Sequence, residues 1–302
     1  MNILEIKDVF KQYGKFTVLN HISLSVPEGS IYGLLGPNGA GKTSLIRIIT
    51  QITAPDSGEI IFKGEKLSPR HSGMIGYLPE ERGLYKKMKV GEQLLYLSRL
   101  KGMSKQEAET KLEKWITKFG IEDWIKKNIE DLSKGMQQKV QFIATVMHEP
   151  PLIILDEPFT GFDPINVNLL RKEILELKKK GTTIIFSTHR MESVEDLCDY
   201  MSLIYKAEII LEGSKKEIKA DAKTNIYLVE GNGALGNLPE GYTIDHFENE
   251  EEGEFKAEIK INGGSASELI RYLTEKIVIH SFKEKVPSMN EIFIHTIQNH
   301  HK

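Results

Sequence analysis

The segment GPNGAGKTS, residues 36–44, has the composition and spacing of a loop that binds phosphate groups. Its glycines permit positive backbone φ angles and let successive amide groups approach an anion closely. Lys42 would place a positive charge at the β- and γ-phosphates, and the Thr43 hydroxyl is a ligand for Mg²⁺. The sequence therefore predicts phosphate binding by Gly36, Pro37, Asn38, Gly39, Ala40, Gly41, Lys42, Thr43 and Ser44.

Two acidic residues follow a buried-strand pattern in LIILDEP, residues 152–158. Such a strand delivers its acids to the edge of the sheet beside the phosphate loop, where Asp156 can hold Mg²⁺, usually through water. Glu157, one residue further, is a candidate general base that polarises the attacking water. Taken alone, the segment fits a strand that ends in solvated acids equally well, and only the phosphate loop favours the catalytic interpretation.

A third candidate is His189 in STHR, residues 187–190. The segment follows another apolar run, so the imidazole would project from a strand end into the same crevice. A single histidine is more often a structural residue than a catalytic one, but its place after a core strand favours catalysis. We therefore predict that the catalytic residues are Lys42, Glu157 and His189.

A second phosphate-binding pattern occurs in LSKGMQQK, residues 132–139. Ser133 can donate its hydroxyl proton, Gly135 allows close backbone approach, and the helix that follows presents its positive end. The alternative is that Ser133 only caps this helix. The two roles are compatible, because the same unpaired amides at the helix start serve both.

A parallel sheet must bring these segments together. The apolar run IYGLLG, residues 31–36, precedes the glycine-rich loop, and SLIRIITQI, residues 44–52, has the period of a helix. Strand, loop and helix in this order disfavour a glycine-rich turn that binds nothing. Further buried-strand runs at 152–157 and 182–189 predict an α/β core of the P-loop NTPase type, with its sheet covered on both faces.

Two further regions have a different character. Residues 90–149 are mostly helical in pattern, with Ser104 and Glu107 as a capping box, and predict a helical subdomain inserted in the sheet fold. After about residue 222 short strands alternate with helices, the last opened by the capping box of Ser288 and Glu291. We predict a nucleotide-binding domain at 1–222, with the helical subdomain at about 90–149, and a small α+β accessory domain at 223–302.

Composition limits the function. The 302 residues include 40 Lys and Arg against 43 Asp and Glu, a net charge of −3, which argues against a large basic face for nucleic acid but leaves a local patch open. The single cysteine, Cys198, cannot form an internal disulfide and fits a reducing compartment. Since no apolar run approaches the roughly 18 residues of a spanning helix, we expect a soluble, cytosolic chain whose membrane role needs a partner.

The order GPNGAGKT, LSKGMQQ, LIILDEP, GFDP and STH resembles that of the ATP-binding cassette (ABC) family, the nucleotide-binding subunits of ABC transporters, over roughly the first 220 residues. The resemblance implies an ATPase that uses ATP and Mg²⁺. It also implies that two cassettes pack head to tail, so that each ATP lies between the P-loop of one chain and the signature LSxG of the other. Ser133 and Gly135 would then bind the γ-phosphate across the interface.

Three single positions gain a role from the same resemblance. Tyr13 in KQYGKF matches the aromatic residue that stacks on adenine, although a hairpin or core tyrosine fits nearly as well. Asp163 in GFDP matches the loop that crosses between the two sites. Glu80 stands where the family usually has Gln, in a segment that contacts the membrane partner, and its carboxylate can still ligate a hard cation. The expected metal ligands are Thr43, Glu80 and Asp156.

The sequence YLPEERGLY, residues 77–85, and a C-terminal region that closes with the segment SMNEIFI are similar to ATPase subunits of ABC-2 type exporters, including those proposed for sodium or drug extrusion. The resemblance implies a cytoplasmic subunit, peripheral on the inner membrane face, that powers a separate permease as a homodimer or with a related ATPase subunit. No nucleic-acid partner is expected. The alternative, a soluble ABC-type ATPase acting on nucleic acid or ribosomes, would need a long coiled coil or a second P-loop, and a kinase or GTPase leaves LSKGMQQ unexplained.

Overall fold

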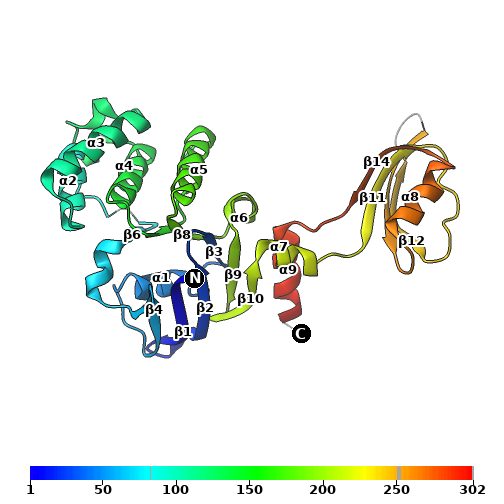
Figure 1. Cartoon of the computed structure of the whole chain (residues 1–302), viewed down its shortest axis with the longest axis horizontal. Coiled ribbons are helices and arrows are strands. Elements are labelled where there is room, and N and C mark those ends of the chain that lie inside the picture. The colour runs from blue at the N-terminus through cyan, green and yellow to red at the C-terminus, as the bar shows by residue number, and fades with distance from the viewer. Residues whose placement is uncertain (82, 250–252, 301–302) are drawn as a thin grey trace. The chain divides into compact units, whose positions relative to one another are not determined.

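In the computed structural model, which describes residues 1–81, 83–249 and 253–300, the chain folds into two compact units (Figure 1). One comprises Met1–Lys215 together with the chain end from His295, and the other comprises Lys216–Ile294. The division into domains at 1–222 and 223–302 stays a prediction. Among the described residues, no helix combines the length and apolar character needed to cross a bilayer.

The first unit is built on a sheet with the strand order β10-β9-β3-β8-β7-β6. All pairs are parallel except β10 with β9. Every residue of β3, β7 and β8 is buried, as expected for strands covered on both faces. The bounds are β3 (Ile31–Leu35), β6 (Ile75–Leu78), β7 (Leu152–Asp156), β8 (Thr183–Thr188), β9 (Tyr200–Tyr205) and β10 (Glu208–Ser214). The predicted α/β core is therefore confirmed.

A second, antiparallel sheet has the order β2-β1-β4-β5. Its buried face and helix α1 (Lys42–Ile49) share one hydrophobic core with the parallel sheet, in which Leu4, Ile46 and Ile154 all take part. This packing fixes the start of α1, and with it the glycine-rich loop, against the end of β3. The strand bounds are β1 (Asn2–Tyr13), β2 (Phe16–Pro27), β4 (Ser57–Phe62) and β5 (Glu65–Lys66).

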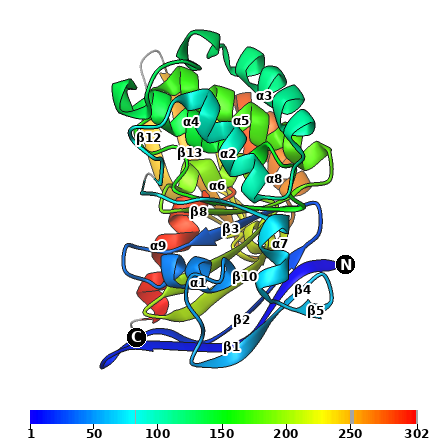
Figure 2. The ribbon, with the colours of Figure 1, turned by 90° about the vertical axis from the view of Figure 1, so that its left-hand side faces the viewer.

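A layer of helices, predicted from the 90–149 pattern, lies on one side of this unit. Trp115, Phe119 and Phe142 pack together between α3 and α4. The predicted capping box at the start of α3 is confirmed, since Glu107 N donates to Ser104 Oγ at 3.3 Å and Ser104 N donates to Glu107 Oε2 at 2.9 Å. Figures 1 and 2 show α4 and α5 side by side. The helical layer consists of α2 (Val90–Leu100), α3 (Lys105–Phe119) and α4 (Lys134–Val146). The helices that follow it along the chain are α5 (Pro164–Lys179), α6 (Met191–Leu197) and α7 (Lys215–Asp221), and all of α7 except Lys215 belongs to the second unit.

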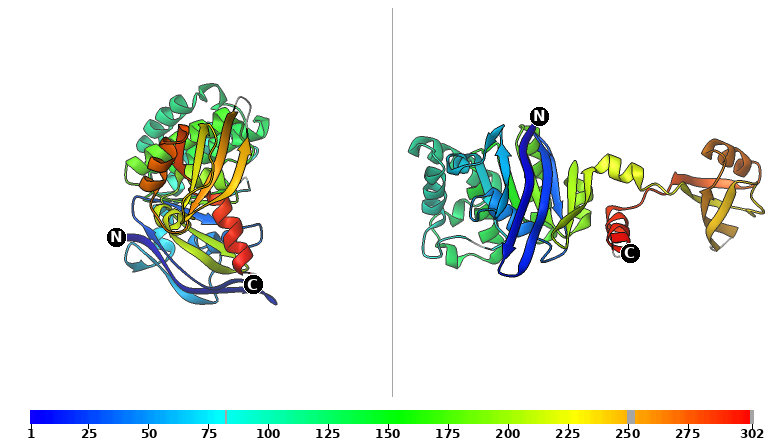
Figure 3. Two further views of the ribbon diagram at one scale, coloured as in Figure 1. Left: turned by 90° about the vertical axis from the view of Figure 1, so that its right-hand side faces the viewer. Right: turned by 90° about the horizontal axis from the view of Figure 1, so that it is seen from below.

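The second unit is an antiparallel sheet of order β12-β13-β11-β14 with helix α8 on one face (Figure 3). Val229, Phe255 and Ile259 of the sheet and Leu269 and Leu273 of α8 form its core. The bounds are β11 (Ile226–Asn232), β12 (Tyr242–Asn249), β13 (Glu254–Ile261), α8 (Ala266–Thr274) and β14 (Val278–Glu284). The last described helix, α9 (Met289–His300), begins in this unit, and its residues from His295 belong to the first. The capping box before α9 is confirmed by the bond from Ser288 N to Glu291 Oε2 at 2.7 Å.

Candidate active site

The glycine-rich loop runs from the end of β3 to the start of α1 and needs glycine at two of its positions. Gly36 has φ 147° and Gly41 has φ 116°. A Cβ atom at Gly36 would lie 2.2 Å from the carbonyl oxygen of Ile204, and one at Gly41 would lie 2.3 Å from that of Val18. A side chain at either position would therefore displace the backbone on which α1 begins.

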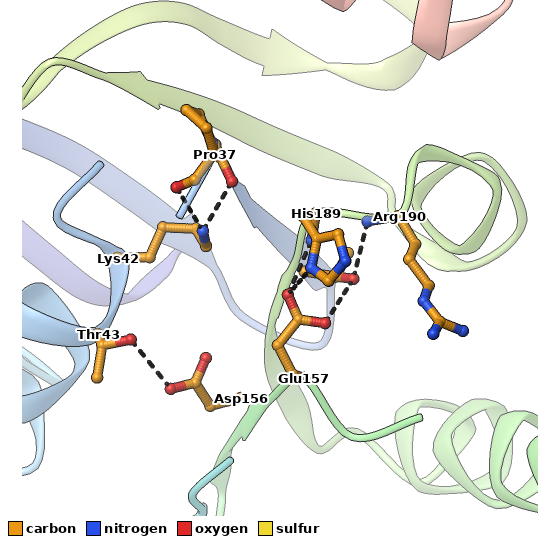
Figure 4. Close-up of polar contacts among 9 residues, drawn as sticks. Pro37, Lys42, Thr43, Asp156, Glu157, His189 and Arg190 are labelled. Atoms are coloured by element: carbon orange, nitrogen blue, oxygen red, sulfur yellow. Dashed lines mark hydrogen bonds and ion pairs between the residues drawn. The ribbon is translucent and has the colours of Figure 1, made fainter. Parts of the chain in front are cut away.

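The Lys42 side chain is folded back onto the loop. Its Nζ donates to the carbonyl oxygens of Gly36 at 2.7 Å and Pro37 at 3.1 Å (Figure 4). Burial lowers the pKa of the Lys42 ammonium, and three nearby carboxylates, those of Glu157, Asp156 and Glu80, oppose that shift. The ammonium thus lies between the phosphate loop and these three carboxylates, where it can contact the β- and γ-phosphates of a nucleotide.

Asp156, the last residue of β7, reaches the start of α1. The Thr43 hydroxyl donates to Asp156 Oδ2 at 3.5 Å, and Asp156 is only 2% exposed. Burial raises the pKa of the Asp156 carboxyl, and the negative charges of Glu80 and Glu157 raise it further. A divalent cation would relieve this repulsion, so Thr43, Asp156 and Glu80 suit a hard cation chemically.

The protein offers few ligands to such a cation. In the described part of the chain, no three His, Cys, Asp or Glu side chains are arranged as a metal cage. Mg²⁺ in nucleotide sites ordinarily keeps several waters and binds through one or two carboxylates together with the phosphates of the substrate.

Glu157 follows β7 directly and has the left-handed φ of 47°, a conformation that costs free energy in a residue other than glycine. Its N–H donates to the carbonyl of Ser187 at 3.0 Å. Its carboxylate accepts bonds from Thr188 Oγ1 at 3.2 Å, from His189 N at 2.9 Å and from His189 Nδ1 at 2.6 Å (Figure 4). The end of β8 therefore fixes the backbone and the carboxylate of the candidate base.

These residues surround one cavity of about 300 Å³. Its lining consists of Val18, Asn38, Gly39, Ala40, Gly41, Lys42, Thr43, Ser44, Glu80, Asp156 and Glu157. The tertiary structure thus brings residues 38–44 of the loop, both acids and Glu80 to one cavity. Gly36 and Pro37 are outside its described lining, and their carbonyl oxygens accept from Lys42. His189 belongs to the site through its bond to Glu157.

The sequence analysis assigned no role to two residues of the site. Val18, early in β2, forms part of the cavity wall, and Thr188 holds the Glu157 carboxylate. The polar Thr188 at the end of an apolar run was the signal that could have identified the second of them. Tyr13 lies near the turn between β1 and β2 with 44% of its surface exposed, and the ring is 5.4 Å from Lys11 Nζ.

Ser133, Gly135 and Asp163 are absent from the described lining of that cavity. Ser133 is the N-cap of α4, where its Oγ accepts a bond from Met136 N at 3.3 Å. Asp163 is the N-cap of α5 and accepts a bond from Asn166 N at 3.0 Å. The two loops are close, since the nearest atom to a Cβ at Gly135 would be the carbonyl oxygen of Gly161, 3.8 Å away. The Ser133 segment, the second candidate for phosphate binding, therefore lies outside the described lining of this chain's own P-loop cavity.

A larger cavity of about 680 Å³ shares Thr43, Glu80 and Asp156 with the first one. Its other walls come from α1 and the residues just after it, from the segment after β6 and from the helical layer. Apolar side chains there include Ile52, Leu84, Leu97, Leu100 and Ala144, and Arg47 and Lys101 add positive charge. His148 also lines it, and burial, with some help from Lys101 and Lys111, lowers the pKa of this imidazole to about 4. The segment carrying Glu80 is thus a wall common to both cavities.

This fold and site define a P-loop ATPase of the ABC type. A sequence model of the ABC transporter family matches residues 19–160, and a model of the C-terminal domain of DrrA1-3-like ATP-binding proteins matches residues 213–297. The chain belongs to the family of ABC transporter ATP-binding proteins. The resemblance predicted from the motifs, including the accessory C-terminal domain, is confirmed.

Known proteins similar to this chain support the same family assignment. It is 42% identical over 295 residues to the uncharacterized ABC transporter ATP-binding protein YhaQ of Bacillus subtilis, covering 98% of both chains. It is 35% identical to the linearmycin resistance ATP-binding protein LnrL of the same organism, over 72% of this chain and 70% of LnrL. A solved ATP-binding subunit of an ABC transporter matches with a TM-score of 0.69 and 32% identity, over 72% of this chain and 92% of that one. The protein is therefore an ATP-binding, ATP-hydrolysing subunit that powers a separate permease.

Proposed function

We propose that this chain is the motor of an exporter and that two cassettes, two copies or one copy and a relative, enclose each ATP jointly. The carrying observation is that the P-loop cavity holds Lys42, Asp156 and Glu157 but not Ser133 or Gly135. In the proposed complex, Ser133 and the amides at the start of α4 contact the γ-phosphate bound by the other subunit. Asp163 crosses between the two sites, and Tyr13 stacks on adenine.

Mg²⁺ would be held by Thr43 and Asp156, with Glu80 in the position of a third ligand. Bound there, the cation neutralises charge that develops on the phosphates. Glu157, which the end of β8 fixes in place, accepts the proton of the attacking water. Lys42 exchanges the two loop carbonyls for phosphate oxygens.

The larger cavity beside Glu80 is the proposed contact for the permease. Apolar side chains of the helical layer and the segment after β6 line it, and it shares Asp156 with the nucleotide cavity. A permease segment seated there would touch a wall of the ATP site directly. Localisation at the inner face of the membrane follows from this partner, and the resistance function in the name of LnrL favours export.

The joint site can be tested with purified chain. We expect the specific ATPase rate to fall on dilution, because dimers dissociate. Mixing a Lys42→Ala chain with a Ser133→Ala chain should restore turnover above the sum of the two separate rates, since the mixed dimer contains one intact site. A strictly monomeric sample whose specific rate stays constant on dilution, with no gain on mixing, would overturn the proposal.

The permease can be sought separately. A membrane-spanning protein encoded beside this chain's gene should co-purify with it from membranes, and an exposed charge introduced by Leu100→Glu should weaken that association. Recovery of the same protein in equal amount with Leu100→Glu would remove the larger cavity as the contact.

A further inference from the structure

An ion pair joins the helical layer to α5. Lys118, near the end of α3, contacts the carboxylates of both Glu173 and Glu176, and the contact with Glu176 Oε2 measures 2.7 Å. The Glu173 side chain is only 2% exposed, whereas Lys118 is 30% and Glu176 37% exposed. The Lys118 ammonium also lies 5.4 Å from the ring of Trp115 on its own helix. Glu173 on α5 is thus a buried carboxylate that pairs with the Lys118 ammonium of the facing helix α3.

The energetics of this pair are asymmetric. Burial lowers the pKa of Lys118, but hydrogen bonds and charge from Glu173 and Glu176 outweigh it and raise that pKa above its ordinary value. Loss of one partner from a buried pair leaves an uncompensated charge, whereas apolar side chains of similar volume in place of both are often tolerated. Separation of α3 from α5 would therefore leave Glu173 without its cation.

The two helices lead to two functional loops. α3 packs through Trp115 and Phe119 on Phe142 of α4, with ring centroids 6.4 and 5.9 Å apart, and α4 begins directly after Ser133. α5 begins directly after Asp163. A displacement of α3 and α4 along α5 would therefore change the offset between the two loops.

α5 is also tied to the element that follows His189. Arg171 Nη1 contacts Asp196 Oδ2 of α6 at 2.7 Å, and the Arg171 guanidinium lies 5.7 Å from the ring of Phe159. α5 therefore has charged contacts to both sides, one to the helical layer and one to the helix after β8. Both described ion pairs between α3 and α5 are made by Lys118. Among these ion pairs, Lys118 is therefore the residue that resists a shift of the helical layer relative to α5.

We propose that Lys118 and Glu173 are positioning residues that fix the offset between the Ser133 loop and the Asp163 loop, so that both meet the second cassette together. This inference rests on the proposed joint ATP site. Neither residue lines the P-loop cavity. The pair therefore acts on closure of the two cassettes and leaves ATP binding by a single chain unchanged.

The test uses the full chain with Glu157→Gln, in which ATP is not turned over. Lys118→Met is compared with Lys118→Arg, which keeps the charge, and with Lys114→Met, the same substitution at an exposed position one turn earlier on α3. The dissociation constant of the Mg·ATP-dependent dimer is measured by analytical ultracentrifugation, and ATP affinity of the dilute monomer by fluorescence titration. We expect Lys118→Met to weaken the dimer by about tenfold or more, with monomer ATP affinity unchanged, because loss of one partner from a buried pair leaves the helical layer free to shift along α5. Lys118→Arg and Lys114→Met should match the parent.

A double variant, Lys118→Met with Glu173→Met, separates position from stability. Removal of both charges should restore the melting temperature but leave the dimer weak, which supports a positioning role. Recovery of both, or equal dimer constants for Lys118→Met and the parent, overturns it. So does a loss of monomer ATP affinity that equals the loss in dimer strength. If the Glu157→Gln parent itself forms no ATP-dependent dimer, the joint site and the positioning role both fail.

Discussion

His189 holds the carboxylate of Glu157 through two contacts. Its ring Nδ1 lies 2.6 Å from Glu157 Oε1, and its backbone N–H donates to the same oxygen at 2.9 Å. With Glu157 as an ionised base the carboxylate can only accept, and the proton of this bond is then supplied by Nδ1. The residues at the end of β8 thus orient the side chain of Glu157, the candidate base, although the backbone of Glu157 itself lies in a strained conformation.

Glu157→Gln should nearly abolish turnover while ATP binding and the ATP-dependent dimer persist. The amide keeps the shape of the side chain but cannot take the proton of the attacking water, and general bases contribute roughly 10²- to 10⁴-fold. Single-turnover hydrolysis and gel filtration with Mg·ATP measure the two effects. Glu192→Gln, at an exposed position on α6, is the matched control. Hydrolysis by Glu157→Gln within tenfold of the parent would remove Glu157 from the role of base.

Glu80→Gln should make the Mg²⁺ dependence of ATPase activity less steep and shift its acid limb to lower pH. The negative charge of Glu80 adds to burial in raising the pKa of Asp156. Loss of that charge lowers the Asp156 pKa, so the carboxylate stays ionised, and able to bind the cation, further into the acid range. Mg²⁺ titrations at several pH values measure both effects, with Glu81→Gln as control. Superimposable curves for Glu80→Gln and the parent would exclude Glu80 as a ligand.

Asp156→Asn should raise the melting temperature of the nucleotide-free, EDTA-treated chain by a few degrees at neutral pH while turnover is lost. The folded-state pKa of Asp156 is raised, chiefly by burial, so its protonated form is the one the fold favours. That contribution is complete below the ordinary carboxyl pKa of about 4 and is lost as pH rises through the raised value. The gain of Asp156→Asn should therefore shrink as pH falls, which scanning fluorimetry can follow. An equal or lower melting temperature at neutral pH would contradict this account.

Gly135→Ala should leave the single chain intact and lower turnover more than tenfold. A Cβ at Gly135 has no atom closer than 3.8 Å, and alanine is favoured over glycine in a helix by about 1 kcal/mol. Only approach of a nucleotide from a second cassette would be obstructed. Gly41→Ala is the contrasting variant, because its Cβ would lie 2.3 Å from a backbone oxygen and should disrupt ATP binding itself. Normal turnover by Gly135→Ala would argue against cross-subunit contact.

Local patterns in the sequence determined much of this molecule. The glycine spacing identified the phosphate loop, the apolar run before Asp156 identified its strand, and the Ser104 and Ser288 capping boxes marked helix starts that the structure confirms. These features succeed because their physical causes act within a few residues along the chain, through backbone conformation, strand burial and helix capping.

Only the tertiary structure decided how the site is held. Thr188 and His189 bond to Glu157 from more than thirty residues away, and Lys118 meets Glu173 across two helices. Val18 enters the cavity wall because β2 packs against α1. Such pairs depend on strand order and on the packing of one helix against another, which a local pattern of residue types does not specify. The sequence therefore supplied the chemical groups, and the order of the strands and the packing of the helices placed them.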